Sequence, residues 1–167
     1  MIAGARQALG NDDRFTFVQR VVARTSEGEA DDHRSLAPED FAQAEAMGRF
    51  CLCWDAHNRR YGLPISVQTD LALGKVVVAN VSRHVIGPAC LKFPACAVVL
   101  ITAEISRRAE RLTRQGRESR EQITARLARE SAPVPSGINP IIIDNSGRAA
   151  IGVTAFVMAL RTIAAQD

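Results

Sequence analysis

Arginine is the residue type through which this sequence could bind anionic ligands. The chain of 167 residues contains 19 arginines but only two lysines, Lys75 and Lys92. A guanidinium binds two phosphate or carboxylate oxygens at once, whereas an ammonium group acts as a point charge. A GC-rich genome, which favours arginine codons, would also produce this bias. The composition therefore allows a role in phosphate binding without requiring one.

The first candidate site is the pair Arg20 and Arg24. The segment 15–22 predicts a β-strand, alternating at first and then continuously apolar. Two residues four positions apart on an extended chain project to the same face. At the carboxyl end of a strand in an open α/β sheet, where ligands bind, the pair would clamp a doubly phosphorylated ligand. Two solvated arginines are the alternative interpretation.

A second group of arginines lies between positions 107 and 129 and is interleaved with glutamates. Its eight members are Arg107, Arg108, Arg111, Arg114, Arg117, Arg120, Arg126 and Arg129. Mixed charges of this kind are typical of a solvated, salt-bridged helix. The predicted helix is interrupted at Gly116, which favours instead a loop that closes over a ligand. In such a loop, arginines would stabilise the charge on a phosphoryl group during its transfer. The residues alone leave both interpretations open.

The remaining polar motifs predict no metal site. The histidines are His33, His57 and His84, and the cysteines are Cys51, Cys53, Cys90 and Cys96. Neither set has the spacing of a metal site or a catalytic triad, so reduced, buried thiols are expected. Tyr61 ends a segment rich in hydrogen-bonding groups and could donate to a phosphate. A core tyrosine with a satisfied hydroxyl is the alternative.

The elements that must position these residues predict a single α/β domain. Helices are predicted at 2–9, 38–47 and 66–73, within 103–129, and after position 147; strands are predicted at 15–22, 50–54, 76–79, 97–101 and 141–143. The last three runs are short, β-branched and continuously apolar, as in a parallel sheet covered by helices on both faces. This order implies a layered α/β domain with an arm inserted at about 25–65.

Composition sets the broad class of the protein. The chain is 47% apolar and 23% charged, with a formal net charge of +3, which is enough apolar material for one core. No apolar run approaches the roughly 20 residues that span a bilayer, and the first residues do not resemble a secretory signal. We therefore expect a soluble, cytoplasmic domain with no membrane partner. Interleaved glutamates and few aromatic residues argue against nucleic acid as a partner.

In order and spacing, the motifs resemble the guanylate-kinase-like branch of the P-loop nucleoside monophosphate kinases. The closer resemblance is to the bacterial ribose 1,5-bisphosphate phosphokinases. The matching pieces, in chain order, are Arg20-x3-Arg24, Ala37-Pro38-Glu39-Asp40-Phe41, Trp54-x-Ala56-x4-Tyr61-Gly62, Asn80-Val81-Ser82-Arg83, and a segment from Arg111 to Leu127. Each piece is modest, but together they cover most of the chain, from about position 20 to position 145.

The resemblance implies a parallel sheet sandwiched by helices in one domain over 1–167. It implies a core at 1–24 and 66–167, an acceptor-binding arm at 25–65 and a helical lid at about 107–130. The implied catalytic residues are Arg117 and Arg126; the implied substrate-binding residues are Arg20, Arg24, His33, Tyr61 and Arg83; Asp144 and Asn145 would line an adenine pocket. ATP and Mg²⁺ are the implied cofactors, and a small sugar phosphate is the implied partner.

Three substitutions distinguish this chain from the guanylate kinases. Those enzymes carry guanine-reading acids where this chain has Leu52 and Ser82, and an acceptor-phosphate tyrosine where it has His33. Without the two carboxylates, guanine N–H groups would remain unpaired at a cost on the order of several kcal/mol. The resemblance therefore implies the reaction ATP + ribose 1,5-bisphosphate → ADP + 5-phosphoribosyl 1-diphosphate. A guanylate kinase and a non-catalytic kinase-like binding module are the alternatives, although the retained arginines favour an enzyme.

One part of the family pattern has no counterpart in these 167 residues. The family's first strand and its G-x-x-G-x-G-K-[DST] phosphate loop are missing, and the opening residues resemble the middle of the helix that follows. We therefore expect Met1 to be an internal position of a longer parent protein and this chain to be crippled as a kinase. Gln115 also stands where relatives have a lid arginine.

The missing strand has a structural consequence, because in this superfamily it lies in the middle of the sheet. We expect the strands at 76–81 and 97–102 either to pair directly or to have the space between them filled by another chain. Exposed strand edges invite such pairing. A homodimer or swapped oligomer is therefore predicted.

Overall fold

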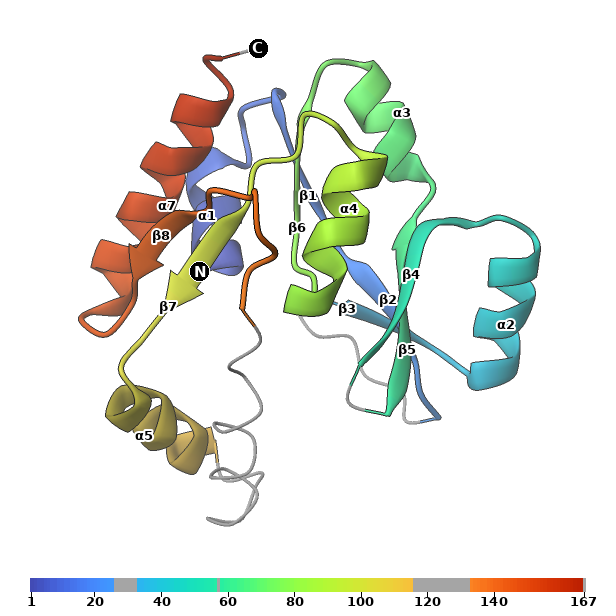
Figure 1. Ribbon diagram of the computed structural model, residues 1–167, viewed down its shortest axis with the longest axis horizontal. Helices are drawn as coiled ribbons and strands as arrows, with labels where there is room; N and C mark the ends of the chain where they lie inside the picture. The colour runs from blue at the N-terminus through green and yellow to red at the C-terminus, as the bar shows by residue number, and fades with distance from the viewer. Residues whose placement is uncertain (26–32, 57, 116–132, 167) are drawn as a thin grey trace.

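The computed structural model describes residues 1–25, 33–56, 58–115 and 133–166 (Figure 1). The described helices are α1 (Ile2–Leu9), α2 (Pro38–Ala46), α3 (Ser66–Ala72), α4 (Ile86–Lys92), α5 (Ile105–Gln115) and α7 (Ala149–Ile163), with a 3-10 turn, η1, at Arg83–Val85. The described strands are β1 (Phe15–Val18), β2 (Arg20–Ala23), β3 (His33–Leu36), β4 (Phe50–Ala56), β5 (Arg59–Pro64), β6 (Val76–Ala79), β7 (Val99–Thr102) and β8 (Ile141–Asp144). None of the described helices has the length and apolarity needed to cross a membrane.

The described strands form three hydrogen-bonded groups. β1 and β6 are parallel, as are β7 and β8. The other four strands form one mixed sheet in the order β3–β2–β5–β4, which we call the arm sheet. In Figure 1 the arm sheet and α2 lie on one side of the molecule, and β7, β8 and α7 lie on the other.

The two parallel strand pairs share an apolar core with α1 and α7. Phe156 and Leu160 are one helical turn apart on α7, and both are buried. They belong to one cluster with Phe15 of β1, Val78 of β6 and Ile143 of β8. Because this cluster draws on β1, β6 and β8 together, it holds the two strand pairs against a common layer of helices.

A glycine allows α1 and α7 to pack closely. A Cβ atom added at Gly4 would lie 2.8 Å from Cγ2 of Val153, closer than side chains approach in practice. These two helices pack against each other. Close packing of α1 against α7 therefore requires glycine at position 4.

A second core fixes the arm sheet to the rest of the domain. Its buried members are Val22, Cys51, Trp54, Ala56, Tyr61, Leu63, Val67 and Val85, with Val77 and Ala79 of β6 packed against them. The cluster thus joins β2, β4 and β5 of the arm sheet to α3, η1 and β6. The arm sheet is anchored to the parallel strands rather than projecting freely.

The prediction of one strand over 15–22 is wrong. β1 ends at Val18 and β2 begins at Arg20, and the two strands belong to different sheets. β1 pairs with β6, whereas β2 pairs with β3 and β5, so the chain crosses between sheets at Gln19. The arm sheet consequently begins at Arg20, five residues before the predicted start of the arm.

Sequence reasoning missed three described elements: β3, β5 and α4. β5 begins at Arg59, directly after Asn58, whose positive φ of 56° makes the tight turn of the hairpin. The segment before β3 is polar, which favours a loop on sequence grounds. α4 contains Pro88, which is tolerated because it lies in the first turn of the helix, where backbone N–H groups have no helical partner.

The strands at 76–79 and 99–102 do not pair with each other, so direct pairing is not the arrangement adopted. Among the described residues, β6 pairs only with β1, and β7 only with β8. A cavity of about 820 Å³ lies between the two strands and is lined by residues of both. The oligomeric state stays a prediction.

Candidate functional site

One face of the arm sheet collects most of the residues predicted to bind the substrate. Residues directly opposite each other in adjacent strands project to the same face, and alternate residues of one strand do as well. Arg20 lies opposite His33, and Val22 lies opposite both Ser35 and Tyr61. Tyr61 in turn lies opposite Trp54. We call this surface the arginine face.

An aromatic stack positions Arg20 on the arginine face. The Cζ atom of Arg20 lies 5.2 Å from the centroid of the Tyr61 ring. The rings of Tyr61 and Trp54 stack at 5.5 Å between centroids, with an angle of 12° between their planes. Tyr61 is 9% exposed and Trp54 is 5% exposed. A guanidinium over a largely buried ring gains on the order of 1 kcal/mol from cation–π attraction, which favours one orientation of the side chain.

The stack is joined to the parallel strands by a hydrogen bond. The indole Nε1 of Trp54 donates to the hydroxyl of Ser82 over 3.1 Å. Ser82 lies just after β6 and directly before Arg83, the first residue of η1. The carboxyl ends of parallel strands are where open α/β sheets bind ligands. The bond therefore holds the arginine face next to the strand end that carries Arg83.

Arg24 is oriented by β3. Its Nε donates to the hydroxyl of Ser35 over 2.7 Å, and its backbone N–H donates to the carbonyl of Leu36 over 2.8 Å. Because Ser35 lies on the arginine face, the Arg24 guanidinium is directed to the same face as Arg20. The predicted pair thus occupies one surface, together with His33.

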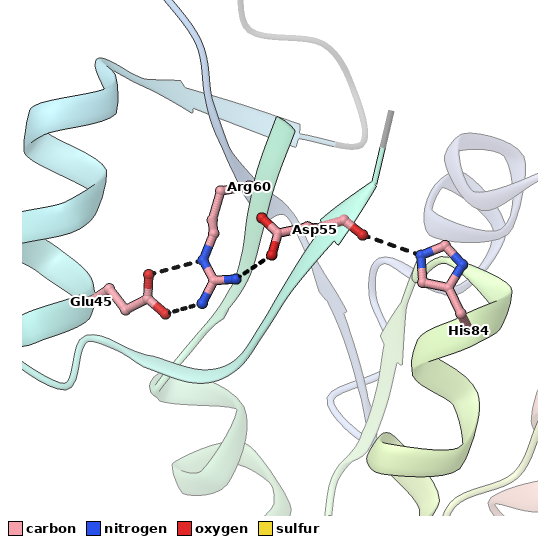
Figure 2. A network of polar contacts seen from close by, with 4 residues as sticks. All are labelled: Glu45, Asp55, Arg60 and His84. Carbon is pink, nitrogen blue, oxygen red and sulfur yellow. Dashed lines mark hydrogen bonds and ion pairs between the residues drawn. The ribbon is translucent and has the colours of Figure 1, made fainter. Parts of the chain in front are cut away.

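A separate ionic network stabilises the opposite face of the arm sheet (Figure 2). The guanidinium of Arg60 on β5 donates to both carboxylate oxygens of Glu45 on α2, at 3.1 and 2.5 Å, and to Asp55 on β4 at 2.6 Å. These bonds lower the pKa of Glu45 and raise that of Arg60. The backbone carbonyl of Asp55 lies 3.2 Å from the Nε2 atom of His84. The network fastens α2 to the β4–β5 hairpin.

Asp144 and Asn145 lie at the carboxyl end of β8, away from the arm sheet. Asp144 accepts hydrogen bonds from the backbone N–H and the hydroxyl of Ser146, at 3.0 and 2.6 Å, which lower its pKa. The backbone N–H of Asn145 donates to the carbonyl of Thr102 over 2.7 Å. The side-chain Oδ1 of Asn145 is buried without a hydrogen-bond partner in the structure as described. This oxygen lies against α7, where a Cβ atom added at Gly152 would be 2.7 Å away from it.

The remaining predicted residues are placed as follows. Arg117 and Arg126 lie outside the described residues. Within the described ranges, no three His, Cys, Asp or Glu side chains form a group that could hold a metal ion. The cysteines are reduced, and only Cys51 is fully buried. The Sγ atoms of Cys90 and Cys96 lie 2.7 Å apart.

Sequence reasoning overlooked the positioning role of Ser35, Ser82 and Arg60. Ser35 and Ser82 are single hydroxyls in unremarkable surroundings, and their partners lie 11 and 28 residues away along the chain. The sequence pattern places Arg60 in a turn, although its neighbours Arg59 and Tyr61 alternate with it along β5. Burial along β5 does not alternate, since Tyr61, Gly62 and Leu63 are buried in succession, so no alternating pattern reveals the strand.

Comparison with known proteins identifies relatives over nearly the whole chain. A ribose 1,5-bisphosphate phosphokinase of Brucella abortus is 45% identical over 160 residues, which are 96% of this chain and 83% of that protein. A counterpart in Rhodopseudomonas palustris is 40% identical over 147 residues, 88% of this chain and 73% of that protein. A bifunctional ribose 1,5-bisphosphokinase-thymidine phosphorylase of Cupriavidus necator is 40% identical over 162 residues, 97% of this chain and 27% of that protein.

Solved structures agree on the fold. The guanylate kinase of Anaplasma phagocytophilum superimposes with a TM-score of 0.69, covering 96% of this chain and 80% of its own, at 14% sequence identity. No protein-family model matches the sequence. The relatives from Brucella abortus and Rhodopseudomonas palustris are 45% and 40% identical to this chain, and the matches cover more than two thirds of each relative. These matches establish the family. The chain belongs to the ribose 1,5-bisphosphate phosphokinases, a family of phosphotransferases, and has the guanylate-kinase-like fold.

Proposed function

We propose that this chain provides the acceptor site of a ribose 1,5-bisphosphate phosphokinase: it binds ribose 1,5-bisphosphate on the arginine face, and, joined to the family's phosphate loop, it transfers the terminal phosphoryl group of ATP to the 1-phosphate. The products are ADP and 5-phosphoribosyl 1-diphosphate. One O–P bond of ATP is broken and one O–P bond to the 1-phosphate is formed. The names of the relatives support the substrate.

The observation that carries the proposal is the composition of the arginine face. Arg20, Arg24 and His33 converge on it, and Arg83 lies beside it, whereas none of the six arm-sheet residues assigned to this face carries a carboxylate. A ligand with two phosphates and a small polar ring matches such a surface, because guanidiniums bind phosphate oxygens bidentately. Tyr61 offers a hydroxyl at the same position.

The face is poorly suited to guanine. Ser82 accepts a hydrogen bond from Trp54, so the residue at one guanine-reading position of the guanylate kinases is committed to holding the stack. Leu52, at the other such position, has no polar atom on its side chain. Guanine N–H groups would therefore lack hydrogen-bond acceptors at both positions. We propose that GMP is a poorer phosphoryl acceptor than ribose 1,5-bisphosphate.

Kinases use nucleotides, and we propose ATP as the donor of the phosphoryl group. Asp144 and Asn145 are proposed to line the pocket that binds its adenine ring. Their place at the carboxyl end of β8, where open α/β sheets bind ligands, supports this assignment. ATP supplies the phosphoryl group when bound. Arg117 and Arg126 are proposed to stabilise that group as it moves, through the charge on its equatorial oxygens.

Mg²⁺ does not fit a protein-held site in the described part of the chain, which offers no suitable cluster of carboxylates. In kinase-like sites this ion is held largely by the substrate phosphates and water. We therefore assign no step of the reaction to a magnesium ligand of this chain.

A ³¹P NMR assay tests the proposed function. A longer version of the chain that also carries the family's phosphate loop is mixed with ATP, magnesium chloride and either ribose 1,5-bisphosphate or GMP. The proposal predicts diphosphate signals of 5-phosphoribosyl 1-diphosphate and ADP in the first mixture, above the rate without protein. Formation of GDP at a higher rate than 5-phosphoribosyl 1-diphosphate would overturn it.

A further inference from the structure

Two cysteine thiols lie next to each other at the end of α4. The Sγ atoms of Cys90 and Cys96 are 2.7 Å apart, about 0.7 Å more than the length of an S–S bond. Both cysteines are free. Cys90 lies in the last turn of α4, and Cys96 lies three residues before β7. A small movement of the two side chains would therefore bring the sulfur atoms to bonding distance.

Hydrogen bonds hold the backbone between the two cysteines in a compact turn. The backbone N–H of Phe93 donates to the carbonyl of Ala89 over 2.9 Å, and the N–H of Cys96 donates to the carbonyl of Phe93 over 3.0 Å. Pro94 lies inside this turn, and its ring fixes one further backbone angle. The turn therefore limits how far the two thiols can separate.

Metal binding is the other chemistry open to a pair of thiols, but this pair lacks further ligands. Over the part of the chain that the structure describes, no group of three His, Cys, Asp or Glu side chains could hold a metal ion, whereas a structural zinc site needs four ligands. The thiol of Cys51 donates to the carbonyl of Pro64 over 3.3 Å, and the thiol of Cys53 bonds to Glu45. Oxidation is therefore the chemistry that Cys90 and Cys96 fit.

The thiol pair is open to small molecules in solution. Both cysteines are half-buried, and Leu91, which lies between them, is 86% exposed. Burial and the neighbouring Cys90 thiol raise the pKa of Cys96. Because the thiolate is the form that attacks a disulfide, exchange at this pair is faster at mildly alkaline pH than at neutral pH.

The loop between the two cysteines contacts the core beneath the arginine face. Phe93 lies inside this loop and packs against the buried cluster that contains Trp54 and Tyr61. Val85, directly before α4, belongs to the same cluster. A bond between the two sulfur atoms would close the loop and restrain Phe93 at the edge of this core.

We propose that Cys90 and Cys96 are a reversible thiol–disulfide pair, oxidised by a small-molecule disulfide such as oxidised glutathione. In the first step the thiolate of one cysteine attacks oxidised glutathione, forms a mixed disulfide and releases one glutathione. In the second step the other cysteine loses its proton, attacks the protein sulfur of the mixed disulfide and releases the second glutathione. The protein thiols lose two electrons and two protons, and one glutathione disulfide is reduced to two thiols. The inference does not depend on the function proposed above.

Peptide mapping of the full chain tests the proposal. The protein is equilibrated with mixtures of reduced and oxidised glutathione at mildly alkaline pH, quenched with acid, alkylated and digested with trypsin. Cleavage after Lys92 places the two cysteines in separate peptides, 84–92 and 93–107, so only a disulfide holds these peptides together. We expect the linked peptides to increase with the share of oxidised glutathione and to disappear when dithiothreitol is added.

The other cysteines provide the controls. Cys51 and Cys53 lie together in the tryptic peptide 50–59, which should be recovered with both thiols alkylated. Cys53→Ser should leave the linked peptides unchanged. In Cys90→Ser and in Cys96→Ser, the remaining cysteine of the pair should instead retain glutathione, because no second thiol is present to displace it.

Oxidation should also raise the thermal stability of the chain. Closing the loop restricts the unfolded chain, so the midpoint of thermal unfolding should rise by about 5 °C or more. Circular dichroism in the oxidising and reducing buffers measures this midpoint. Cys96→Ser should show no such rise, because it cannot close the loop.

Four results would overturn the proposal. The first is absence of the linked peptides at every glutathione ratio, and the second is a disulfide within the peptide 50–59 that forms to the same extent. The third is a disulfide between two chains, seen as a dimer on a non-reducing gel. The fourth is an oxidised chain whose unfolding midpoint equals that of the reduced chain, which would show that the closed loop restrains nothing.

Discussion

Arg20 is positioned by an aromatic stack that extends from the arm sheet to the end of β6. Tyr61 supports the guanidinium, Trp54 supports Tyr61, and Ser82 fixes Trp54. Arg24 is fixed independently, through Ser35 on β3. Two arginines held by different strands make the arginine face ordered without a ligand, as the proposed binding of phosphates requires.

Arg24→Ala tests the arginine face directly. Loss of a charge-assisted hydrogen bond to a phosphate costs about 1.5–3 kcal/mol, so the Kd for ribose 1,5-bisphosphate should rise roughly 10- to 100-fold. Isothermal titration calorimetry measures this constant. Arg34→Ala is the matched control, since Arg34 lies on β3 between two residues of the arginine face and projects to the other side. An equal loss in both variants would contradict the assignment.

Ser82→Ala tests the anchor of the stack. The indole N–H of Trp54 would lose its acceptor in a site where the ring is 5% exposed, at a cost of about 1–3 kcal/mol in the free energy of unfolding. Trp54 is the single tryptophan, so its fluorescence reports this site alone. We expect emission at shorter wavelength and a lower urea midpoint. Ser66→Ala, at an exposed serine on α3, is the control; a variant at Ser82 indistinguishable from it would refute the anchor.

At the residue scale, the sequence predicts the candidate ligands better than it predicts their supports. Alternation along an extended chain places Arg20 and Arg24 on one face, and the strand register agrees. The supports Ser35 and Ser82 depend on contacts between segments distant in sequence, which no local pattern encodes. The interpretation of Tyr61 as a core residue agrees with the structure, because its ring is 9% exposed and lies beneath Arg20. Its role in binding a phosphate stays a prediction.

Among the elements, the β4–β5 hairpin carries the arginine face on one side and the Arg60 network on the other. Glu45 lies on α2, so the network ties the helix to the sheet across 15 residues of sequence (Figure 2). This connection holds the hairpin against α2.

Arg60→Met should reduce stability in a pH-dependent way. The folded pKa of Glu45 is lowered from 4.5 by Arg60, so the pair stabilises the fold above that pH and loses its effect as pH falls through the lowered value. For a partly exposed pair we expect a difference on the order of 1 kcal/mol at neutral pH. Urea unfolding at neutral pH and below the lowered pKa measures it. The control is Arg59→Met, at the exposed neighbouring position; a difference that persists undiminished in acid would contradict the account.

The elements differ in how far sequence predicts them. The continuous apolar runs identify β6, β7 and β8, because strands covered on both faces need no polar side. β3 and β5 escape prediction, because their residues are mixed in polarity and each strand begins with polar or charged residues that favour a loop. The break at Gln19 also escapes it, because strand propensity does not reveal which neighbour a strand will pair with.

Across the whole molecule, the layer of α1 and α7 holds together two strand pairs that share no hydrogen bonds among the described residues. Their common core therefore carries much of the stability of this half. The predicted gap in the sheet exists as the cavity of about 820 Å³ between β6 and β7, and these two strands do not pair with each other.

Leu160→Ala measures the contribution of this core. Leu160 is 3% exposed, and truncating a buried leucine costs about 2–5 kcal/mol in the free energy of unfolding. Met158→Ala on the same helix is the control, because Met158 is 65% exposed and should change stability by about 0.5 kcal/mol or less. Chemical denaturation followed by circular dichroism distinguishes the two. Similar losses in both variants would show that α7 is not packed as described.

The most direct test of the central claim is a comparison of two ligands by the fluorescence of Trp54, which lies beneath Tyr61 and Arg20. Ribose 1,5-bisphosphate and GMP are titrated separately into the chain. Our account predicts a saturable change with ribose 1,5-bisphosphate, and a Kd for GMP at least about tenfold higher, because the arginine face offers phosphate ligands and no guanine acceptors. Equal or tighter binding of GMP would contradict it.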